Sequence, residues 1–444
     1  MEPDAVESDH VARAAHRSLV SLKALNPIGR TMQILFLAHR IPYPPDKGER
    51  IRAFQELRYL GARHDVDLFC FADSQECANH QKLLRTKCRS VHVEVLRQPT
   101  RLLRAAINSV TGRPMSFGFF WSRTFHENVR QALHKCKYDA IFVYSSSMGQ
   151  FIPQPAPAPV VVDFVDADSQ KFKQYAIRSR SVRAWLYARE ARAVATAEQS
   201  LGRLATLSFA VTEHDARELR GSDAAGFNVE VVPNGVQVPD TSDVSNQDSF
   251  PELRPFALFV GTMSYPPNSD AAVHFARDIL PLVRRSHPEL KFVVVGRDPD
   301  RRVRNLTAIP GVFVIGAVPD AFRYFRSAEV SVAPFRISQG FHNKIAESLA
   351  VGTPVITTSR AKAGIGLAEP EGLFVAETAE DFANKLTIAL DPDLRQRLRK
   401  GASAVQSALS WDGRLSKMEQ LIVQVAAKSD SPSYELVAEN YSNG

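Results

Sequence analysis

Residues 336–354 (RISQGFHNKIAESLAVGTP) decide the fold prediction for the whole chain. They begin at the end of a short apolar run, residues 330–335, which is typical of a buried strand. A glycine-containing turn follows, and then a helix that Gly352 ends and Pro354 cannot continue. A second apolar run at 354–358 restores the strand pattern. The order predicts a parallel sheet with a helix N-terminus at its carboxyl edge.

The first turn of that helix suits an anionic ligand. Free backbone N–H groups and the helix dipole favour negative charge there. Lys344 adds a positive charge in the first turn, and Glu347 offers two acceptor oxygens slightly further along. A cation for phosphate and a carboxylate for a diol are what a nucleotide sugar requires. The segment therefore predicts a nucleotide-sugar site.

Length and composition predict two globular domains. The chain has 444 residues, 44% of them hydrophobic and 23% charged, which is enough for two cores. No apolar run approaches the roughly 18–20 residues of a membrane span, and the first thirty residues contain no apolar segment of a secretory signal. The four cysteines show no metal-ligand spacing and are expected to be free thiols. We expect a cytoplasmic protein.

Short apolar runs alternate with helical patterns from Met32 onward, which predicts parallel, doubly wound sheets. A polar segment rich in turn-forming residues separates two such halves, and we expect these two Rossmann-like domains to face an interdomain cleft. The expected divisions are a disordered N-terminal extension (1–31), an acceptor domain (32–237), a linker (238–254), a nucleotide-sugar domain (255–411), a helix that crosses back to the first domain (412–427) and a disordered tail (428–444).

Two glycine loops are candidate ligand contacts because each follows the first strand of a domain. Gly48 ends a loop with two prolines and begins a helix, so a phosphate or sugar could approach its backbone. Gly261 ends the strand at 256–261, and Thr262 follows it in the same way. The alternative is an ordinary strand-to-helix turn, with Asn268 or Ser269 as a helix cap in the second case.

Two further strand ends could present backbone groups to a nucleotide base. One strand ends before Arg297, and its expected neighbour ends before Val318. Both are equally compatible with strands that are simply buried.

The stretch 163–169 (DFVDADS) places three carboxylates at a strand end. An Asp-x-Asp pair suggests a divalent metal, as in metal-dependent transferases. The same spacing recurs at Asp65, Asp298 and Asp391 in unrelated contexts, so Asp168 or Ser169 as a helix cap is the preferred interpretation. Asp166 remains a candidate for a substrate hydroxyl or for transition-state charge.

A predicted helix over 170–204 carries eight basic residues against two acidic ones, with Tyr175, Trp185 and Tyr187 interleaved. With the arginines of 97–113 it predicts a surface for anionic lipid headgroups. The alternative is a solvated basic face. The net charge of +7 also suits an anionic partner, but no nucleic-acid-binding motif accompanies it, so no nucleic acid partner is expected.

The chain resembles the family 4 glycosyltransferases of GT-B fold, and more narrowly the PEP-CTERM/exosortase-associated sugar transferases of exopolysaccharide loci. The resemblance spans about 32–427. It rests on the strand ends at Gly296 and Gly316 and on five segments: 35–52 (LFLAHRIPYPPDKGERIR), 162–172 (VDFVDADSQKF), 231–236 (VVPNGV), 259–268 (FVGTMSYPPN) and 339–353.

The resemblance implies a retaining, metal-independent hexosyltransferase without a cofactor, peripheral on the cytoplasmic face of the inner membrane. It would move a sugar from a nucleoside diphosphate to a hydroxyl of a glycan or lipid-linked glycan. It makes Glu347 the ribose ligand and Lys344 the cation on the diphosphate, and it implies catalytic roles for Lys344, Glu347 and Asp166. The expected donor contacts are Gly48, Gly261, Thr262, Arg297, Val318, Arg336, Gln339, Gly340, Phe341, Asn343, Lys344 and Glu347.

The chain departs from the family pattern twice. The family has two glutamates eight positions apart, and the first position here is Gln339. Thr262 and Met263 stand where many relatives carry a basic pair, so Lys344 and Arg336 would carry more of the diphosphate charge.

Two other functions remain open at this stage. One is a nucleotide-sugar epimerase, which should carry acid/base groups around the sugar, and only Glu347 and His342 are available near 339–347. The other is a non-catalytic nucleotide-sugar-binding scaffold, made conceivable by Gln339.

Overall fold

The computed structural model describes residues 30–45, 48–96, 98–221, 227–239, 250–336, 340–367 and 370–429. The expected extension (apart from its last two residues), most of the linker, the expected tail (apart from its first two residues, which belong to a helix) and Gln339 lie outside the described residues. The chain divides into two compact units. Of the described residues, the first unit comprises those up to Ala210, Asp215–Val232 and those from Leu415 onward, and the second comprises Val211–His214 and those within Pro233–Arg414.

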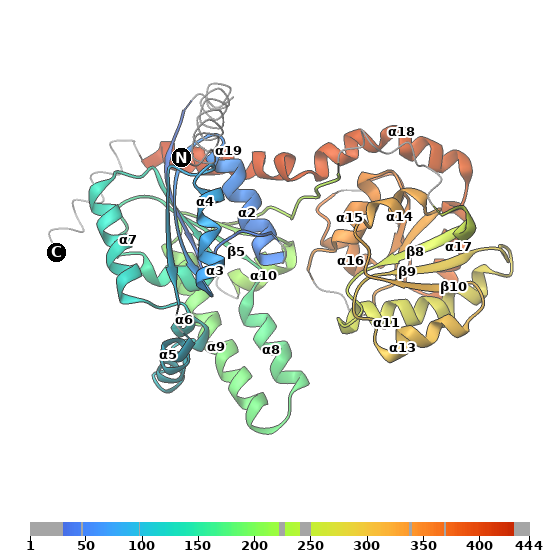
Figure 1. Cartoon of the computed structure of the whole chain (residues 1–444), viewed down its shortest axis with the longest axis horizontal. Helices are drawn as coiled ribbons and strands as arrows, with labels where there is room; N and C mark the ends of the chain where they lie inside the picture. The colour runs from blue at the N-terminus through green and yellow to red at the C-terminus, as the bar shows by residue number, and fades with distance from the viewer. Residues whose placement is uncertain are drawn as a thin grey trace, which may run out of the picture. The chain divides into compact units, whose positions relative to one another are not determined.

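Each unit is built on a parallel sheet with helices, which confirms the predicted α/β class (Figure 1). The central strands of each sheet are almost fully buried, as expected for parallel strands covered on both faces. In the described part of the chain no helix is both long and apolar enough to cross a membrane.

The sheet of the first unit has seven strands in the order β3-β2-β1-β4-β5-β6-β7. The order reverses between β1 and β4, so the loops after these two strands diverge and leave room at the carboxyl edge. The strands are β1 (Gln33–Ala38), β2 (Asp65–Ala72), β3 (Ser90–Val95), β4 (Ala140–Tyr144), β5 (Val160–Val165), β6 (Leu207–Ala210) and β7 (Val229–Val231).

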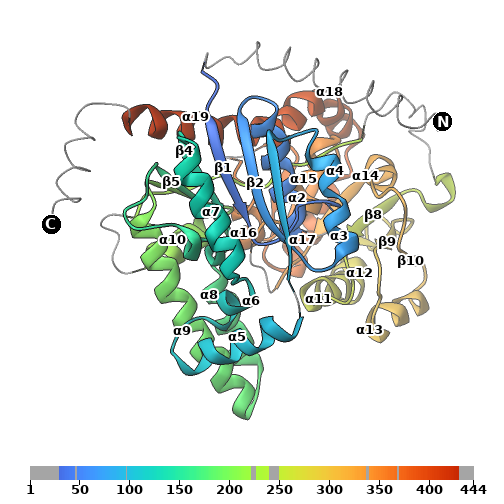
Figure 2. The same ribbon diagram turned by 60° about the vertical axis from the view of Figure 1, so that its left-hand side comes forward.

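The helices of this unit differ from the predicted ones in one respect that shapes its surface. The single helix expected over 170–204 is two helices, α8 (Asp168–Arg178) and α9 (Ser181–Leu204), which form a hairpin (Figures 1 and 2). The chain is extended at Ser179 and Arg180, and Ser181 has φ +56°, so the helical hydrogen bonds stop there. The others are α2 (Gly48–Gly61), α3 (Gln75–Asn79), α4 (Gln81–Leu84), α5 (Gln98–Val110), α6 (Met115–Phe119), α7 (Arg123–Lys135), the 3-10 helix η1 (Ser146–Phe151), α10 (Glu213–Arg220) and α19 (Trp411–Ser429).

A buried guanidinium joins three parts of the first unit. Arg52 on α2 is 1% exposed and donates to Asp163 at 2.6 Å (Nε to Oδ2) and to the carbonyl of Val232 at 2.9 Å. Glu56 lies 2.9 Å from the same Nε. Burial, with Asp163 nearby, raises the pKa of Glu56 well above its usual range. The contact between Arg52 and Asp163 fixes α2 against the end of β5.

The second unit contains a six-stranded sheet in the order β10-β9-β8-β11-β12-β13, and its order reverses between β8 and β11. The strands are β8 (Phe256–Val260), β9 (Lys291–Val295), β10 (Val312–Gly316), β11 (Val330–Ala333), β12 (Val355–Thr357) and β13 (Leu373–Val375). The helices are η3 (Pro251–Leu253), α11 (Pro266–His274), the π-helical turn η4 (Phe275–Ile279), α12 (Leu280–Val283), α13 (Arg301–Arg304), η5 (Asn305–Ala308), α14 (Phe322–Ser327), α15 (Asn343–Ala350), α16 (Ser359–Ala363), α17 (Ala379–Ala389) and α18 (Pro392–Leu409).

The strand, turn, helix, strand order on which the fold prediction rests is present. It consists of β11, the turn after it, α15 and β12, and Gly352 follows α15 with φ +75°. Ile345, Ala346 and Leu349 of α15 join the main hydrophobic core of the unit. Packing of this apolar face leaves the first turn of α15 at the carboxyl edge of the sheet.

Candidate functional site

The candidate site of the second unit lies where the strand order reverses. Residues 261–265 leave the end of β8, and the segment that leads into α15 leaves the end of β11, the neighbouring strand. Ligands of doubly wound sheets bind at such a reversal point. Gly261, Gly340, Lys344 and Glu347, all predicted from sequence, belong to these two segments and to α15.

Lys344 is the central side chain of this site, and it is only 8% exposed. Its Nζ donates to Oδ1 of Asn268 at 2.7 Å and lies 4.5 Å and 4.6 Å from the ring centroids of Phe259 and Phe335. The Asn268 amide in turn donates to the carbonyl of Thr262 at 2.9 Å. An amide oxygen and two aromatic faces orient the ammonium but do not neutralise its charge.

Burial shifts the titration of all three ionisable groups at the start of α15. It lowers the pKa of Lys344 to about 7, and Glu347 limits that fall. It raises the pKa of Glu347 to about 7, and Lys344 limits that rise. Burial and the nearby Lys344 lower the pKa of His342 to about 3, and its ring stacks on Phe335 with centroids 4.4 Å apart. A bound anion would stabilise the Lys344 ammonium, which is poorly stabilised in the free protein.

Glycine is required at two points of the site. A Cβ on Gly261 would lie 2.7 Å from Nδ2 of Asn268 and 3.1 Å from Nζ of Lys344. A Cβ on Gly296, which has φ +151°, would lie 1.7 Å from the carbonyl oxygen of Gly261. Gly340 has φ +80°, and open space surrounds the position of its missing Cβ, so a ligand can approach its backbone.

The remaining predicted donor contacts are placed less uniformly. Arg336 is paired with Asp270 (Nε to Oδ2, 3.0 Å), so its charge is already partly neutralised. The Arg297 side chain is exposed, although its carbonyl accepts a hydrogen bond from Met263 N. Val318 and Phe341 are partly buried and Asn343 is exposed. Their roles in binding remain predictions.

The first unit has a polar group of its own at the reversal between β1 and β4. Gly48 begins α2, and no atom lies within 4 Å of the Cβ it lacks. His39 beside Glu49 (Nε2 to Oε2, 3.9 Å) and the nearby Arg40 lower the pKa of Glu49 to about 2. The Tyr144 hydroxyl at the end of β4 donates to the Glu49 carbonyl at 2.6 Å.

Asp166 lies at the same edge, directly after β5. The residue before it, Val165, is β-branched and has φ +66°, a strained conformation that is most common at functional sites. Desolvation of the carboxylate by surrounding protein atoms is the main cause that raises the pKa of Asp166 to about 6, and the charges of Asp215 and Asp168 add to it. The side chain nevertheless has exposed surface. Asp166 is thus a carboxyl group whose protonation changes close to neutral pH.

The preferred interpretation of Asp168 or Ser169 as a helix cap is wrong. The N-cap of α8 is Ala167, and no side chain of the helix start makes the capping bond. Instead Glu198 of α9 accepts a hydrogen bond from Ser169 N at 3.2 Å. Asn268 is likewise not a cap of α11, whose N-cap is Tyr265. In the part of the chain that the structure describes, no three His, Cys, Asp or Glu side chains are grouped to hold a metal ion.

Sequence reasoning missed the partners that hold Lys344. Asn268 has the signature of a cap because it follows two prolines, and nothing in the sequence indicates its bond to a residue 76 positions away. Phe259 lies near the end of β8, and Phe335 lies shortly after β11, the strand that pairs with β8. Their positions at the ends of two apolar runs were the one sequence signal for these ring contacts. Asp270 offered no signal for its pairing with Arg336.

Comparison with known proteins identifies the family. Residues 48–235 match the model of the glycosyl transferase 4-like domain, and residues 254–391 match that of glycosyl transferases group 1. Together these matches cover well over half of the chain, which belongs to the family 4 glycosyltransferases.

Curated relatives agree with this assignment. The chain is 26% identical to the phosphatidyl-myo-inositol mannosyltransferase of Mycobacterium leprae over 54% of its own length and 60% of the relative's. It is 28% identical to the D-inositol 3-phosphate glycosyltransferase of Acidothermus cellulolyticus over 41% of its own length and 45% of the relative's. The chain spans 60% or less of the length of these curated relatives.

Solved structures show the same GT-B fold. Sucrose-phosphate synthase from Thermosynechococcus elongatus aligns over 90% of this chain and all of its own, with a TM-score of 0.58 at 18% identity. Anabaena Alr3699/HepE in complex with UDP aligns over 88% of this chain and all of its own, with a TM-score of 0.60 at 15% identity.

The environment of Lys344 predicts that removing its charge stabilises the free protein. The folded-state pKa of about 7 lies below the unfolded value near 10.4, so the cost of burying the ammonium develops as pH falls through 10 and is complete below 7. We expect Lys344→Met to raise the free energy of unfolding at pH 7 by ~1–3 kcal/mol, after allowing for the lost bond to Asn268. The gain should disappear above pH ~10.

Urea unfolding of both proteins at pH 6, 7, 8.5 and 10 measures this change. The matched control is Lys385→Met on α17, where the ammonium has no comparable burial, and it should change stability little at any pH. Equal or lower stability of Lys344→Met at pH 7 would show that the buried ammonium carries no such cost.

Proposed function

We propose that the protein is a retaining glycosyltransferase that moves a sugar from a nucleoside diphosphate to a hydroxyl group. The observation that carries this proposal is the buried, poorly neutralised Lys344 at the start of α15, with Glu347 in the same helix. The solved HepE complexes contain UDP and UDP-glucose, which supports a nucleotide-sugar donor.

Lys344 would stabilise the leaving diphosphate. Negative charge develops on the bridging oxygen as the bond to the sugar breaks, and a preoriented cation in a low-dielectric site acts most strongly there. The backbone N–H groups at the start of α15 would also favour the negative charge of the diphosphate. The Asn268 bond and the two ring faces hold the ammonium in position before the donor arrives.

Glu347 would bind the ribose as an ionised carboxylate that accepts from two hydroxyls. Its pKa of about 7 in the free protein means that diol binding should favour its ionised form. Bound diphosphate would favour protonated Lys344 in the same way. Donor binding thus completes an ion pair that the free protein holds only partially.

The acceptor would be activated without a metal ion. A departing diphosphate oxygen on the same face of the sugar could receive the acceptor proton, which gives retention at the anomeric carbon. Asp166, with a pKa near 6, would hold an acceptor hydroxyl or stabilise positive charge on the sugar ring. His342 has a pKa of about 3 and is a poor proton donor at neutral pH, which favours transfer over epimerisation.

We further propose that the pathway is the assembly of an exopolysaccharide or another cell-surface glycan, on the cytoplasmic side of the membrane. The curated relatives are named for lipid and inositol-phosphate acceptors, which supports a glycan or lipid-linked glycan acceptor.

A donor panel tests the proposed function. We expect release of free nucleoside diphosphate from one of the UDP-, GDP-, ADP- or dTDP-sugars, measured by a coupled nucleotide assay. Glu347→Ala should weaken binding of that donor about 100-fold, because two hydrogen bonds to a charged group are lost. Lys344→Ala should raise the barrier to turnover by ~2–4 kcal/mol.

The matched control is Glu371→Ala, an exposed glutamate of the same unit, which should leave donor affinity unchanged. Measurable donor binding without release of nucleotide would support a scaffold instead. Interconversion of sugars without release would support an epimerase. Unchanged donor affinity in Glu347→Ala would remove the ribose assignment.

We also propose that the first unit binds an anionic membrane surface. Large apolar side chains are unusually exposed there, from 52% to 90%, on α5 and on the α8–α9 hairpin: Leu102, Leu103, Ile107, Val110, Ile177, Val182 and Trp185. Exposed basic residues accompany them: Lys171, Lys173, Arg180 and Arg183. Arg189 of α9 donates to the carbonyls of Asn108 and Arg113, so the hairpin and the end of α5 lie side by side. Apolar insertion beside cationic charge suits anionic lipids.

Vesicle sedimentation tests this partner. We expect binding to phosphatidylglycerol vesicles that falls with salt, and little binding to phosphatidylcholine. The double variant Val110→Ser, Trp185→Ser should lose at least tenfold in affinity, while Ile388→Ser, an exposed apolar residue on α17 of the other unit, should not. Equal binding by both variants would contradict the proposed surface.

A further inference from the structure

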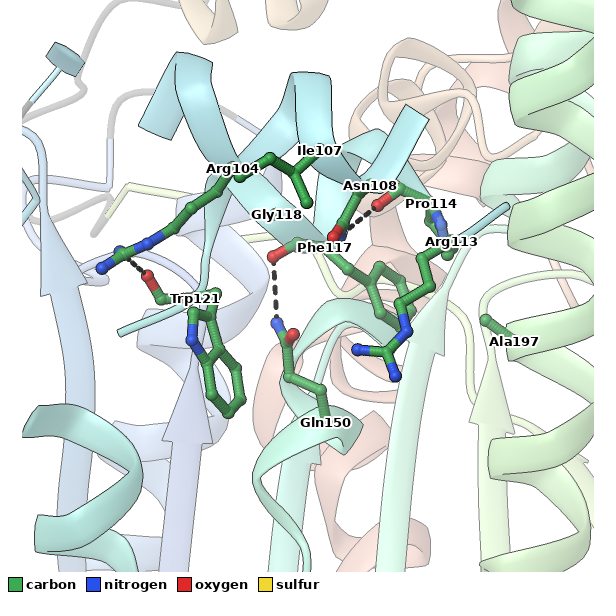
Figure 3. A pocket seen from close by; sticks show the side chains of 10 residues that line it. All are labelled: Arg104, Ile107, Asn108, Arg113, Pro114, Phe117, Gly118, Trp121, Gln150 and Ala197. Atoms are coloured by element: carbon green, nitrogen blue, oxygen red, sulfur yellow. Dashed lines mark hydrogen bonds between the residues drawn. The ribbon is translucent and has the colours of Figure 1, made fainter. Parts of the chain in front are cut away.

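A pocket in the first unit has no role in the donor chemistry. It has a volume of about 560 Å³, within the range of small-molecule sites, and lies among α5, α6, η1 and α9. Figure 3 shows its lining, which is Arg104, Ile107, Asn108, Arg113, Pro114, Phe117, Gly118, Trp121, Gln150 and Ala197.

Buried contacts hold the walls of the pocket in place, so the fold itself determines the shape of the pocket. Glu190 of α9 is fully buried and accepts from Met115 N at 2.9 Å and from Ser116 N at 3.0 Å, at the start of α6. A Cβ on Gly118 would lie 2.7 Å from the Arg104 carbonyl oxygen, which places α6 directly against α5. The Trp121 ring stacks on Phe151 of η1 with centroids 5.4 Å apart.

Most polar groups of the lining are satisfied within the protein. The Gln150 amide donates to the carbonyls of Phe117, Phe120 and Ser147, and the Asn108 amide donates to the Pro114 carbonyl. The Arg104 guanidinium donates to the Trp121 carbonyl. These bonds leave ring and aliphatic surfaces as the chief contact for an occupant.

Arg113 is the exception. Its side chain is exposed and points toward the pocket in Figure 3, and its guanidinium has no hydrogen-bond or ion-pair partner among the described residues. The pocket therefore combines a largely apolar lining with two guanidinium groups: Arg104, which donates to the Trp121 carbonyl, and the exposed Arg113. An alkyl chain that ends in a phosphate complements both features.

The pocket also lies beside the polar group at the edge of the sheet. The short segment 117–121 separates them. Phe117 and Trp121 line the pocket, whereas the Phe120 ring lies 5.2 Å from the ring of His39 and 5.8 Å from the Arg40 guanidinium. The pocket and the polar group around His39 and Arg40 therefore lie on either side of the segment 117–121.

We propose that this pocket binds the alkyl chain of a lipid phosphate, with Arg113 on the phosphate group. As the lipid part of the acceptor, this ligand would carry the hydroxyl that receives the sugar. That acceptor role rests on the proposed function, whereas the binding itself does not. The site is thus an amphiphile subsite, distinct from the nucleotide-sugar site of the other unit.

Calorimetric titration of the full chain with monomeric alkyl phosphates tests the pocket. Each buried methylene should tighten binding about fourfold, so decyl phosphate should bind at least tenfold tighter than octyl phosphate. Inorganic phosphate should not bind measurably at the same concentrations. Decyl maltoside, which has the chain without the charge, should bind several-fold more weakly than decyl phosphate.

Two variants with matched controls locate the binding. Ala197→Phe fills the pocket from α9 and should weaken decyl phosphate binding at least tenfold, while Thr196→Phe, exposed on the same helix, should not. Arg113→Gln should weaken decyl phosphate several-fold and leave decyl maltoside unchanged. Arg123→Gln, whose side chain is 87% exposed and paired with Glu127, is the charge control.

The outcomes separate the pocket from the proposed function. Affinity that ignores chain length, equal effects of Ala197→Phe and Thr196→Phe, or equal binding of the phosphate and the maltoside would overturn the pocket assignment. So would a protein that releases nucleotide from a donor yet binds no decyl phosphate. Chain-length-dependent binding by a protein that turns over no donor would sustain the pocket and remove its acceptor role.

Discussion

The burial of the Lys344 ammonium is the constraint on which the site of the second unit depends. Transfer of a charge into the protein interior is unfavourable unless an opposite charge accompanies it. Here the contacts of Nζ are an amide oxygen and two aromatic faces, and the nearby Glu347 is itself partly protonated near pH 7. In the free protein Lys344 therefore loses its proton close to pH 7, and a dianionic ligand would stabilise its protonated form.

The surrounding residues follow from that requirement. A side chain on Gly261 would displace the ends of the Asn268 and Lys344 side chains, and Gly296 has to lack one because of the Gly261 carbonyl. The apolar face of α15 fixes the helix in the core and so sets the height of Lys344 above the sheet. A site held at a residual cost in stability is a common compromise between folding and function.

Both units place their polar groups where the strand order reverses, but they stabilise them differently. In the first unit the buried Arg52 has an acidic partner, Asp163, at 2.6 Å. That pair secures α2, whose first turn carries Glu49, and it anchors the end of β5 just before the strained Val165. The pairing is structural, and the exposed Asp166 next to it is left available for a ligand.

Sequence patterns predicted the fold well, and they singled out Lys344 and Glu347, whose roles in donor binding remain predictions. Alternating strand and helix signals were sufficient for two parallel sheets, and the GFHNK segment with a following glutamate was sufficient for Lys344 and Glu347. The break between α8 and α9 was missed because the basic residues on both sides continue the helical pattern through Ser179.

Long-range contacts were beyond the reach of sequence patterns. The bond between Asn268 and Lys344 and the assembly of the pocket from α5, α6, η1 and α9 depend on how distant segments pack. Asp168 and Ser169 are residue types that favour the N-cap position, but neither is the N-cap of α8. Glu198 of α9 accepts a hydrogen bond from Ser169 N instead, a contact between distant segments.

Proton uptake on binding of a nucleoside diphosphate tests the central claim about Lys344 most directly. At pH 8 a lysine with a pKa near 7 is mostly neutral, and a bound diphosphate should restore its pKa above 10. Glu347 is already mostly ionised at that pH and should release little. Calorimetric titration of the tightest binder among UDP, GDP and ADP, in buffers of different ionisation enthalpy, should show uptake of close to one proton at pH 8 and none in Lys344→Met. Binding by the wild-type protein without proton uptake would contradict the account.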